Sequence, residues 1–143
     1  MDSTKQLPLT QQSLVLRTDF SDESSWRSIC AAIQAPVGDF MAYVECVSDP
    51  AFAGITASDV VSRVPKGWGH SFLFLVDGVA LSSPERAVLV VDLYEEPGRS
   101  FRVVPHEAWG VENNLSIANM SFSEFADAAD PDGVFRGFPD GVA

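Results

Sequence analysis

Short apolar runs alternate with polar turns along the chain, a pattern that predicts alternating strands and helices. Runs rich in β-branched and aromatic residues predict strands at residues 13–19, 40–47, 71–76, 87–93 and 101–104. The runs at 71–76 and 87–93 are almost unbroken, which is typical of central strands covered on both faces. The pattern therefore predicts a mixed sheet of about five strands.

Three segments carry the signals of a helix. The first helix is expected to begin after Ser21, and four apolar residues share its inner face: Trp26, Ile29, Cys30 and Ile33. A short second helix is expected after Thr56, because Asp59 completes a capping box there. The third is expected after Ser121, where Glu124 plays the same part.

These elements predict a single α/β or α+β domain. A chain of 143 residues, 46% of them hydrophobic, is long enough to bury one core. We expect the domain to span residues 13–138, with flexible tails at 1–12 and 139–143. The order of the strands does not follow from the pattern.

The charge of the chain is strongly acidic, with nine Lys and Arg against twenty Asp and Glu and a formal net charge of -11. This balance argues against binding to nucleic acids or anionic membranes, since both require clustered basic residues. No apolar run approaches the roughly 20 residues of a membrane span, and the first residues lack an apolar leader. A cytoplasmic protein is the expectation.

Neither a metal nor a cofactor is expected. Asp19, Asp77 and Asp92 lie near strand ends, as magnesium ligands often do, but the paired acids and the late lysine of a receiver-like site are missing. Asp77 precedes Gly78, which is typical of a turn. The chain also lacks glycine-rich phosphate loops and the nucleophile elbow of serine hydrolases.

A first polar cluster follows the first predicted strand. If this strand lies within a parallel sheet, its carboxyl end is where ligands usually bind. Asp19 could then act as a base, and Arg17 could hold a carboxylate or phosphate. The alternative is that Asp19 or Ser21 caps the following helix and that Arg17 pairs with a surface acid.

A second polar cluster follows the last predicted strand, in a segment expected to be a loop with one helical turn. It contains an imidazole, carboxylates, amides and an indole, which suit proton transfer and the orientation of a substrate. The alternative is that these groups satisfy irregular backbone. The cluster consists of His106, Glu107, Trp109, Glu112, Asn113, Asn114 and Asn119. The other histidine, His70, is expected only to form a hydrogen bond at the start of a strand.

The segments LVLRTDFSD and RVVPHEAWGVENNLSIANMSFSEFADAADPDGVFRGF resemble a bacterial and fungal family of small proteins of unknown function, over residues 14–138. The resemblance places both polar clusters in the family's recurring pattern, without His106, and implies no activity. The pattern it implies comprises Arg17, Thr18, Asp19, Phe20, Pro105, Trp109, Glu112, Asn113, Asn114, Ser116, Asn119, Phe125, Phe135 and Arg136.

Two hypotheses about function follow. The first is a small cofactor-free enzyme of the isomerase, cyclase or lyase type, which moves a proton on a small organic molecule and requires the two clusters to meet. Its candidate catalytic residues are Asp19, Glu112 and His106, and its candidate binding residues are Arg17, Asn113, Asn114, Asn119 and Trp109. The second is a noncatalytic acidic module, an immunity or regulatory protein that engages a basic protein partner. The first is favoured because buried polar groups beside one another are costly for a scaffold to keep.

Overall fold

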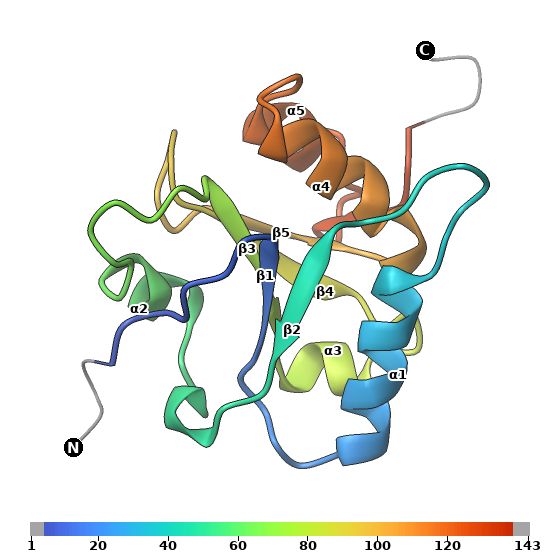
Figure 1. The fold of residues 1–143 in the computed structure, drawn as a ribbon. Helices are drawn as coiled ribbons and strands as arrows, with labels where there is room; N and C mark the ends of the chain where they lie inside the picture. The colour runs from blue at the N-terminus through green and yellow to red at the C-terminus, as the bar shows by residue number, and fades with distance from the viewer. Residues whose placement is uncertain (1–4, 139–143) are drawn as a thin grey trace.

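A computed structural model describes residues 5–138, which form a six-stranded sheet with helices on both faces (Figure 1). The strands lie in the order β2-β1-β3-β4-β5-β6. Their bounds are β1 Ser13–Arg17, β2 Val44–Val47, β3 Phe72–Val76, β4 Val88–Asp92, β5 Ser100–Val103 and β6 Val134–Phe135. The predicted mixed α/β sheet is confirmed, and the strand beyond the expected five is the two-residue β6.

The first strand lies inside the parallel part of the sheet. β1 pairs in parallel with both β2 and β3, whereas β3 with β4 and β4 with β5 are antiparallel. The connection from β1 to β2 contains α1 (Glu23–Gln34), and the connection from β2 to β3 contains α2 (Ala57–Val61) on the other face (Figure 1). Because the two crossovers leave on opposite faces, the carboxyl ends of β1 and β3 form a topological switch point.

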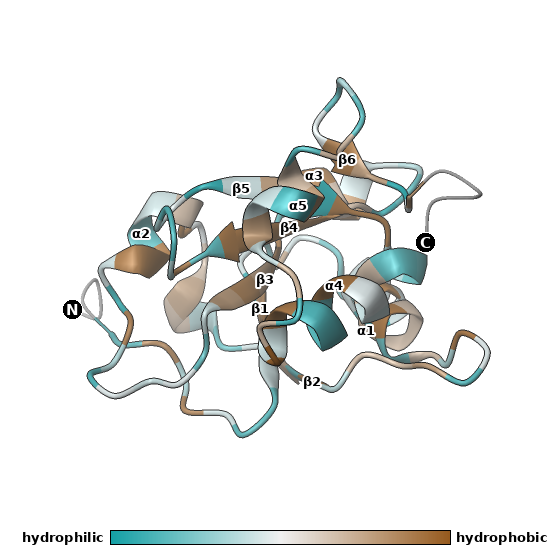
Figure 2. Ribbon diagram, turned by 90° about the horizontal axis from the view of Figure 1, so that it is seen from above, coloured by the Kyte–Doolittle hydropathy of each residue, from teal (hydrophilic) through white to brown (hydrophobic). Residues whose placement is uncertain are grey.

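Two apolar cores lie on the two faces of the sheet. Along β1 and β3 every residue is buried. Val15 and Phe74 belong to the core under α1, while Leu16 and Leu75 belong to the core under α2. The apolar strands colour the centre of the molecule brown in Figure 2, and teal segments surround it. Burial on both faces confirms the expectation for the unbroken apolar runs.

The first helix carries its predicted apolar face but begins later than expected. Its N-cap is Asp22 rather than Ser21, because the Asp22 carboxylate accepts the amide of Ser25 at 3.0 Å. The helix ends at Gln34, just before Pro36. Its buried apolar residues are those expected: Trp26, Ile29, Cys30 and Ile33.

Both predicted capping boxes are present. Thr56 and Asp59 cap α2, and Ser121 and Glu124 cap α5 (Phe122–Ala126). In each box the hydroxyl accepts an amide while the carboxylate accepts the amide of the capping residue.

The turn expected at Asp77-Gly78 is instead the start of a helix, α3 (Gly78–Ser82). The Asp77 carboxylate accepts the amide of Ala80 at 3.1 Å and also binds Arg102 through both oxygens. An aspartate before a glycine suits a turn and a helix N-cap equally, so the local sequence does not separate the two.

The segment expected to be a loop is mostly helical. A 3-10 turn, η2 (Pro105–Glu107), leads into α4 (Ala108–Ser116). Ala108, Val111 and Leu115 are spaced by three and four residues and are buried against the sheet. Asn113 and Asn114 stand between Val111 and Leu115 in the sequence, so the apolar period of the helix is not evident there.

The amino-terminal segment packs against the domain. Residues 5–12 have no regular secondary structure, but Leu7 is buried in the core under α2 and its amide donates to the Arg63 carbonyl at 2.9 Å. The tail expected at 139–143 lies outside the described residues. No helix among the residues described is both long and apolar enough to cross a membrane.

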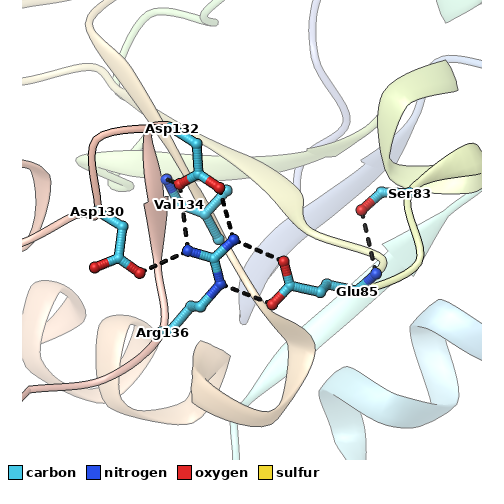
Figure 3. A network of polar contacts seen from close by, with 6 residues as sticks. All are labelled: Ser83, Glu85, Asp130, Asp132, Val134 and Arg136. Carbon is cyan, nitrogen blue, oxygen red and sulfur yellow. Dashed lines mark hydrogen bonds and ion pairs between the residues drawn. The ribbon is translucent and has the colours of Figure 1, made fainter.

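One arginine joins the last strand to the loop before β4 (Figure 3). Arg136 binds both oxygens of Glu85 at 2.7 Å and also reaches Asp130 and Asp132, at 2.6 and 2.7 Å. These contacts hold the pKa values of Glu85 and Asp132 below, and that of Arg136 above, their usual ranges. The network fixes the two-residue β6 at the edge of the sheet.

We expect Arg136→Gln to lower the melting temperature at neutral pH. Folding lowers the pKa values of Glu85 and Asp132 from their unfolded values of 4.5 and 3.8. The difference in melting temperature between Arg136→Gln and the unsubstituted protein should therefore be complete above these values and should shrink as the pH falls through the folded pKa values. Thermal unfolding from neutral to acidic pH measures this. Arg27→Gln, which removes an exposed pair with Glu23, is the control with little expected change. A loss of melting temperature that does not vary with pH would show that the ion pairs of Arg136 are not its cause.

Candidate functional site

Arg17, the last residue of β1, is only 3% exposed. Its Nε donates to the carbonyl oxygen of Asp19 at 3.1 Å, and its Nη1 donates to Glu23 at 2.7 Å. Its guanidinium lies 4.5 Å from the centroid of the Phe20 ring and 5.5 Å from that of Trp26. These contacts fix the path of the chain from β1 into α1.

Asp19 also has local partners. Its Oδ1 accepts the hydroxyl of Ser21 at 2.5 Å and the amide of Ser21 at 2.8 Å, which holds the pKa of Asp19 below its usual value. Its Oδ2 lies 2.8 Å from the position that a Cβ on Gly78 would occupy, so a side chain at the start of α3 would displace the Asp19 carboxylate. A carboxylate with a lowered pKa is a weak base near neutral pH.

The second cluster lies at the opposite end of β1. Glu112 of α4 is 3% exposed and accepts the Ser13 hydroxyl at 2.9 Å and the Tyr43 amide at 2.8 Å. Ser13 and Arg17 are the first and last residues of β1, about 13 Å apart at the rise of a strand. The two clusters therefore do not meet, which the enzyme hypothesis required.

The asparagines of the second cluster bind backbone groups and one another. The Asn113 side chain donates to the Met41 carbonyl at 3.0 Å and to Glu112 at 2.9 Å. The Asn114 side chain donates to the Gly110 carbonyl and accepts the side-chain amide of Asn119, both at 2.8 Å. These bonds fix the carboxyl end of α4 and join it to the segment before β2.

The two aromatic rings predicted for the second cluster have surroundings of their own. His106 is exposed on η2. Trp109 stacks on Phe40 with ring centroids 4.6 Å apart, which joins the start of α4 to the loop before β2. The three candidate catalytic residues belong to three different segments, with Asp19 in the turn after β1, His106 in η2 and Glu112 in α4.

Two cavities lie near the amino end of β1, and Glu112 lines the smaller of them. The larger, of about 580 Å³, lies between the end of β4, the start of β3 and the connection from α4 to α5. The smaller, of about 490 Å³, lies among the segments that precede β1, β2 and β3. Gly69 and Ser116 line both cavities, which are therefore neighbours, and together they are called the acidic cleft.

Asp92, Glu95 and Glu112 line the acidic cleft, and no Lys or Arg is among the described residues that line it. Asp92 is 2% exposed, and its two oxygens accept the amides of Tyr94 and Glu96 at 2.9 and 2.7 Å. Glu112 is likewise held by uncharged donors. The cleft therefore carries negative charge that its own lining does not balance.

The carboxyl end of α4 adds to the negative charge of the cleft. Ser116 ends the helix and lines the cleft, as do Ala118 and Asn119 just beyond it. A helix carries about half a negative charge at its carboxyl end. The last turn of α4 contains no basic residue that would neutralise it.

His70 lines the acidic cleft, which the sequence did not suggest. Its Nε2 lies 2.9 Å from the Thr10 carbonyl oxygen. Its ring packs edge-on against the Trp68 ring, with the two ring centroids 4.7 Å apart. Because a carbonyl oxygen only accepts, Nε2 is the donor, and in the neutral ring Nδ1 is an acceptor. The sequence pattern cannot place His70 there, because its place depends on the parallel pairing of β1, β2 and β3, whose first residues lie at one end of the sheet.

We predict that Glu112→Ala destabilises the protein. It leaves the Tyr43 amide and the Ser13 hydroxyl without their acceptor, at about 1–3 kcal/mol for each group that stays buried. Urea unfolding measures the loss. Glu95→Ala, at an exposed carboxylate of the same cleft, is the control and should change stability by less than about 0.5 kcal/mol. Unchanged stability of Glu112→Ala would mean that the carboxylate has no structural role.

Comparison with known families supports a broad assignment. No curated protein matches this chain. Residues 12–138 match a family model described as "Domain of unknown function (DUF6924)", and this range contains the whole sheet, both polar clusters and nearly all of the acidic cleft. Because the match covers far more than half of the sequence, the chain belongs to this family of unknown function.

Proposed function

We propose that this protein is a noncatalytic binding module that engages a basic protein partner through the acidic cleft. The observation that supports this most is the lining of the cleft, with three carboxylates and, among the described lining residues, no Lys or Arg. Complementary charge steers partners together and disfavours partners of the same sign.

The distribution of charge over the rest of the protein supports the same function. Five arginines form ion pairs with acids that do not line the cleft: Arg17, Arg27, Arg99, Arg102 and Arg136. Of the three cleft acids, Glu95 is exposed to solvent, while Asp92 and Glu112 are buried and bound by uncharged donors, within a chain of net charge -11.

The edge of the cleft has side chains suited to a protein interface. Tyr43 is 55% exposed and Tyr94 is 78% exposed, and both line the cleft. Exposed tyrosines are frequent at the centres of interfaces, because they offer a large apolar surface and a hydroxyl while losing little side-chain entropy. A mixture of tyrosines and carboxylates fits a basic protein surface.

The polar residues that suggested catalysis have structural partners. Asp19 closes the turn into α1, and Glu112 joins α4 to the starts of β1 and β2. A second candidate, an enzyme that transfers protons on a small molecule, retains one supporting observation, namely that His70 and Glu112 line the same cavity.

A basic probe tests the proposed function directly. We expect an oligo-arginine peptide to bind and to bind more weakly as salt is added, because screening shortens the reach of charge. Ser116→Lys, at a residue shared by both cavities, should weaken binding about tenfold or more. Fluorescence anisotropy of a labelled peptide measures the affinity.

Ser28→Lys is the matched control, since it places the same charge on the exposed face of α1. We expect it to change the affinity less than about twofold. Equal effects of the two substitutions, or no binding of the peptide at low salt, would contradict the proposed function.

A further inference from the structure

We propose that the larger cavity of the acidic cleft is a subsite for one arginine side chain of the basic partner, held between Tyr94, Glu95 and the carboxyl end of α4. This inference rests on the proposed function, because it names the group that the partner inserts. It is supported by the walls of the cavity, the carboxylates around it and the way the protein binds its own arginines.

Part of the cavity wall is apolar. Phe72, Leu115, Met120 and Phe122 line it, and at 580 Å³ it falls within the range of cavities that enclose a ligand. An arginine carries a long apolar stem below its charged group, and the stem can lie along such walls while the guanidinium reaches polar atoms. A small inorganic cation would leave most of this apolar surface uncovered.

Two carboxylates line the cavity, one exposed and one buried. Glu95 is exposed and has no ion pair among the described residues, in contrast to its neighbour Glu96, which binds Arg99. Asp92 is buried, and each of its oxygens accepts one amide. Since a carboxylate oxygen has two lone pairs, Asp92 retains acceptor capacity.

The carboxyl end of α4 supplies a third negative wall. Ser116, Ala118 and Asn119 line the cavity where the helix ends. Ala118 adopts a φ of 56°, a left-handed conformation that is uncommon outside glycine and asparagine, and this turns the chain sharply at the wall. A cation is favoured at such a helix end, and a guanidinium offers five donors to the acceptors around it.

The protein binds its own arginines in the same chemical setting. The guanidinium of Arg99 lies 6.0 Å from the Phe122 ring while it binds Glu96 and Asp127. Phe122 also lines the cavity. Arginine is preferred over lysine where carboxylates and aromatic faces meet, because its planar group forks to oxygens and stacks on rings. Tyr94 and Glu95 likewise combine an exposed aromatic ring with a carboxylate, and no arginine of the described residues is paired with Glu95.

Three peptides of equal length test the subsite: oligo-arginine, oligo-lysine and oligo-citrulline. Citrulline keeps the shape of arginine without its charge. We expect the arginine peptide to bind at least about threefold more tightly than the lysine peptide, and the citrulline peptide not to bind. Equal affinity of the arginine and lysine peptides would overturn the assignment to arginine.

Three variants locate the subsite with the arginine peptide. Tyr94→Ala and Glu95→Gln should each lower its affinity about fivefold or more, and both change exposed side chains. Asp39→Asn, at an exposed acid that does not line the cleft, is the control and should change the affinity less than about twofold.

The outcomes separate the two proposals. If the arginine peptide binds and Ser116→Lys weakens its binding while Tyr94→Ala and Glu95→Gln do not, the arginine subsite is wrong and the acidic binding module stands. If no basic peptide binds, both proposals fail. If Ser116→Lys, Tyr94→Ala and Glu95→Gln all weaken binding and Asp39→Asn does not, the subsite is supported.

Discussion

The buried carboxylate of Glu112 is the interaction on which this end of the molecule depends. It joins α4 to the first residue of β1 and to Tyr43, just before β2, through hydrogen bonds of 2.8–2.9 Å. Because the same helix buries Val111 and Leu115 against the sheet, the carboxylate and the apolar core position it together. The acidic cleft is formed where this helix ends, so its geometry follows from that attachment.

The two ends of β1 differ in how their charges are balanced. At the carboxyl end, an arginine, aromatic rings and hydroxyls surround the acids and leave them satisfied. At the amino end, the acids are held by uncharged donors or lie at the surface, beside the carboxyl end of a helix. The first arrangement stabilises a turn, whereas the second favours a cation from outside.

Local signals in the sequence are enough to predict five of the six strands, the inner face of α1 and both capping boxes, because each depends on neighbouring residues. α4 was missed because asparagines conceal its apolar stripe, and Asp77-Gly78 was misassigned because a turn and a helix N-cap share that dipeptide. The separation of the polar clusters and the place of His70 depend on strand order, which the pattern does not contain. The candidate site could therefore be predicted only as separate residues.

The proposed function places a basic partner at the amino end of β1 and not at the switch point at its carboxyl end. Backbone amide chemical shifts, followed by NMR as an oligo-arginine peptide is added, distinguish these two places. We expect shifts that saturate at residues around the cleft, such as Gly69, Glu95 and Ser116, with little change at Asp19 and Gly78. Saturating shifts centred on Asp19 and Gly78, with the cleft unaffected, would contradict the proposed function.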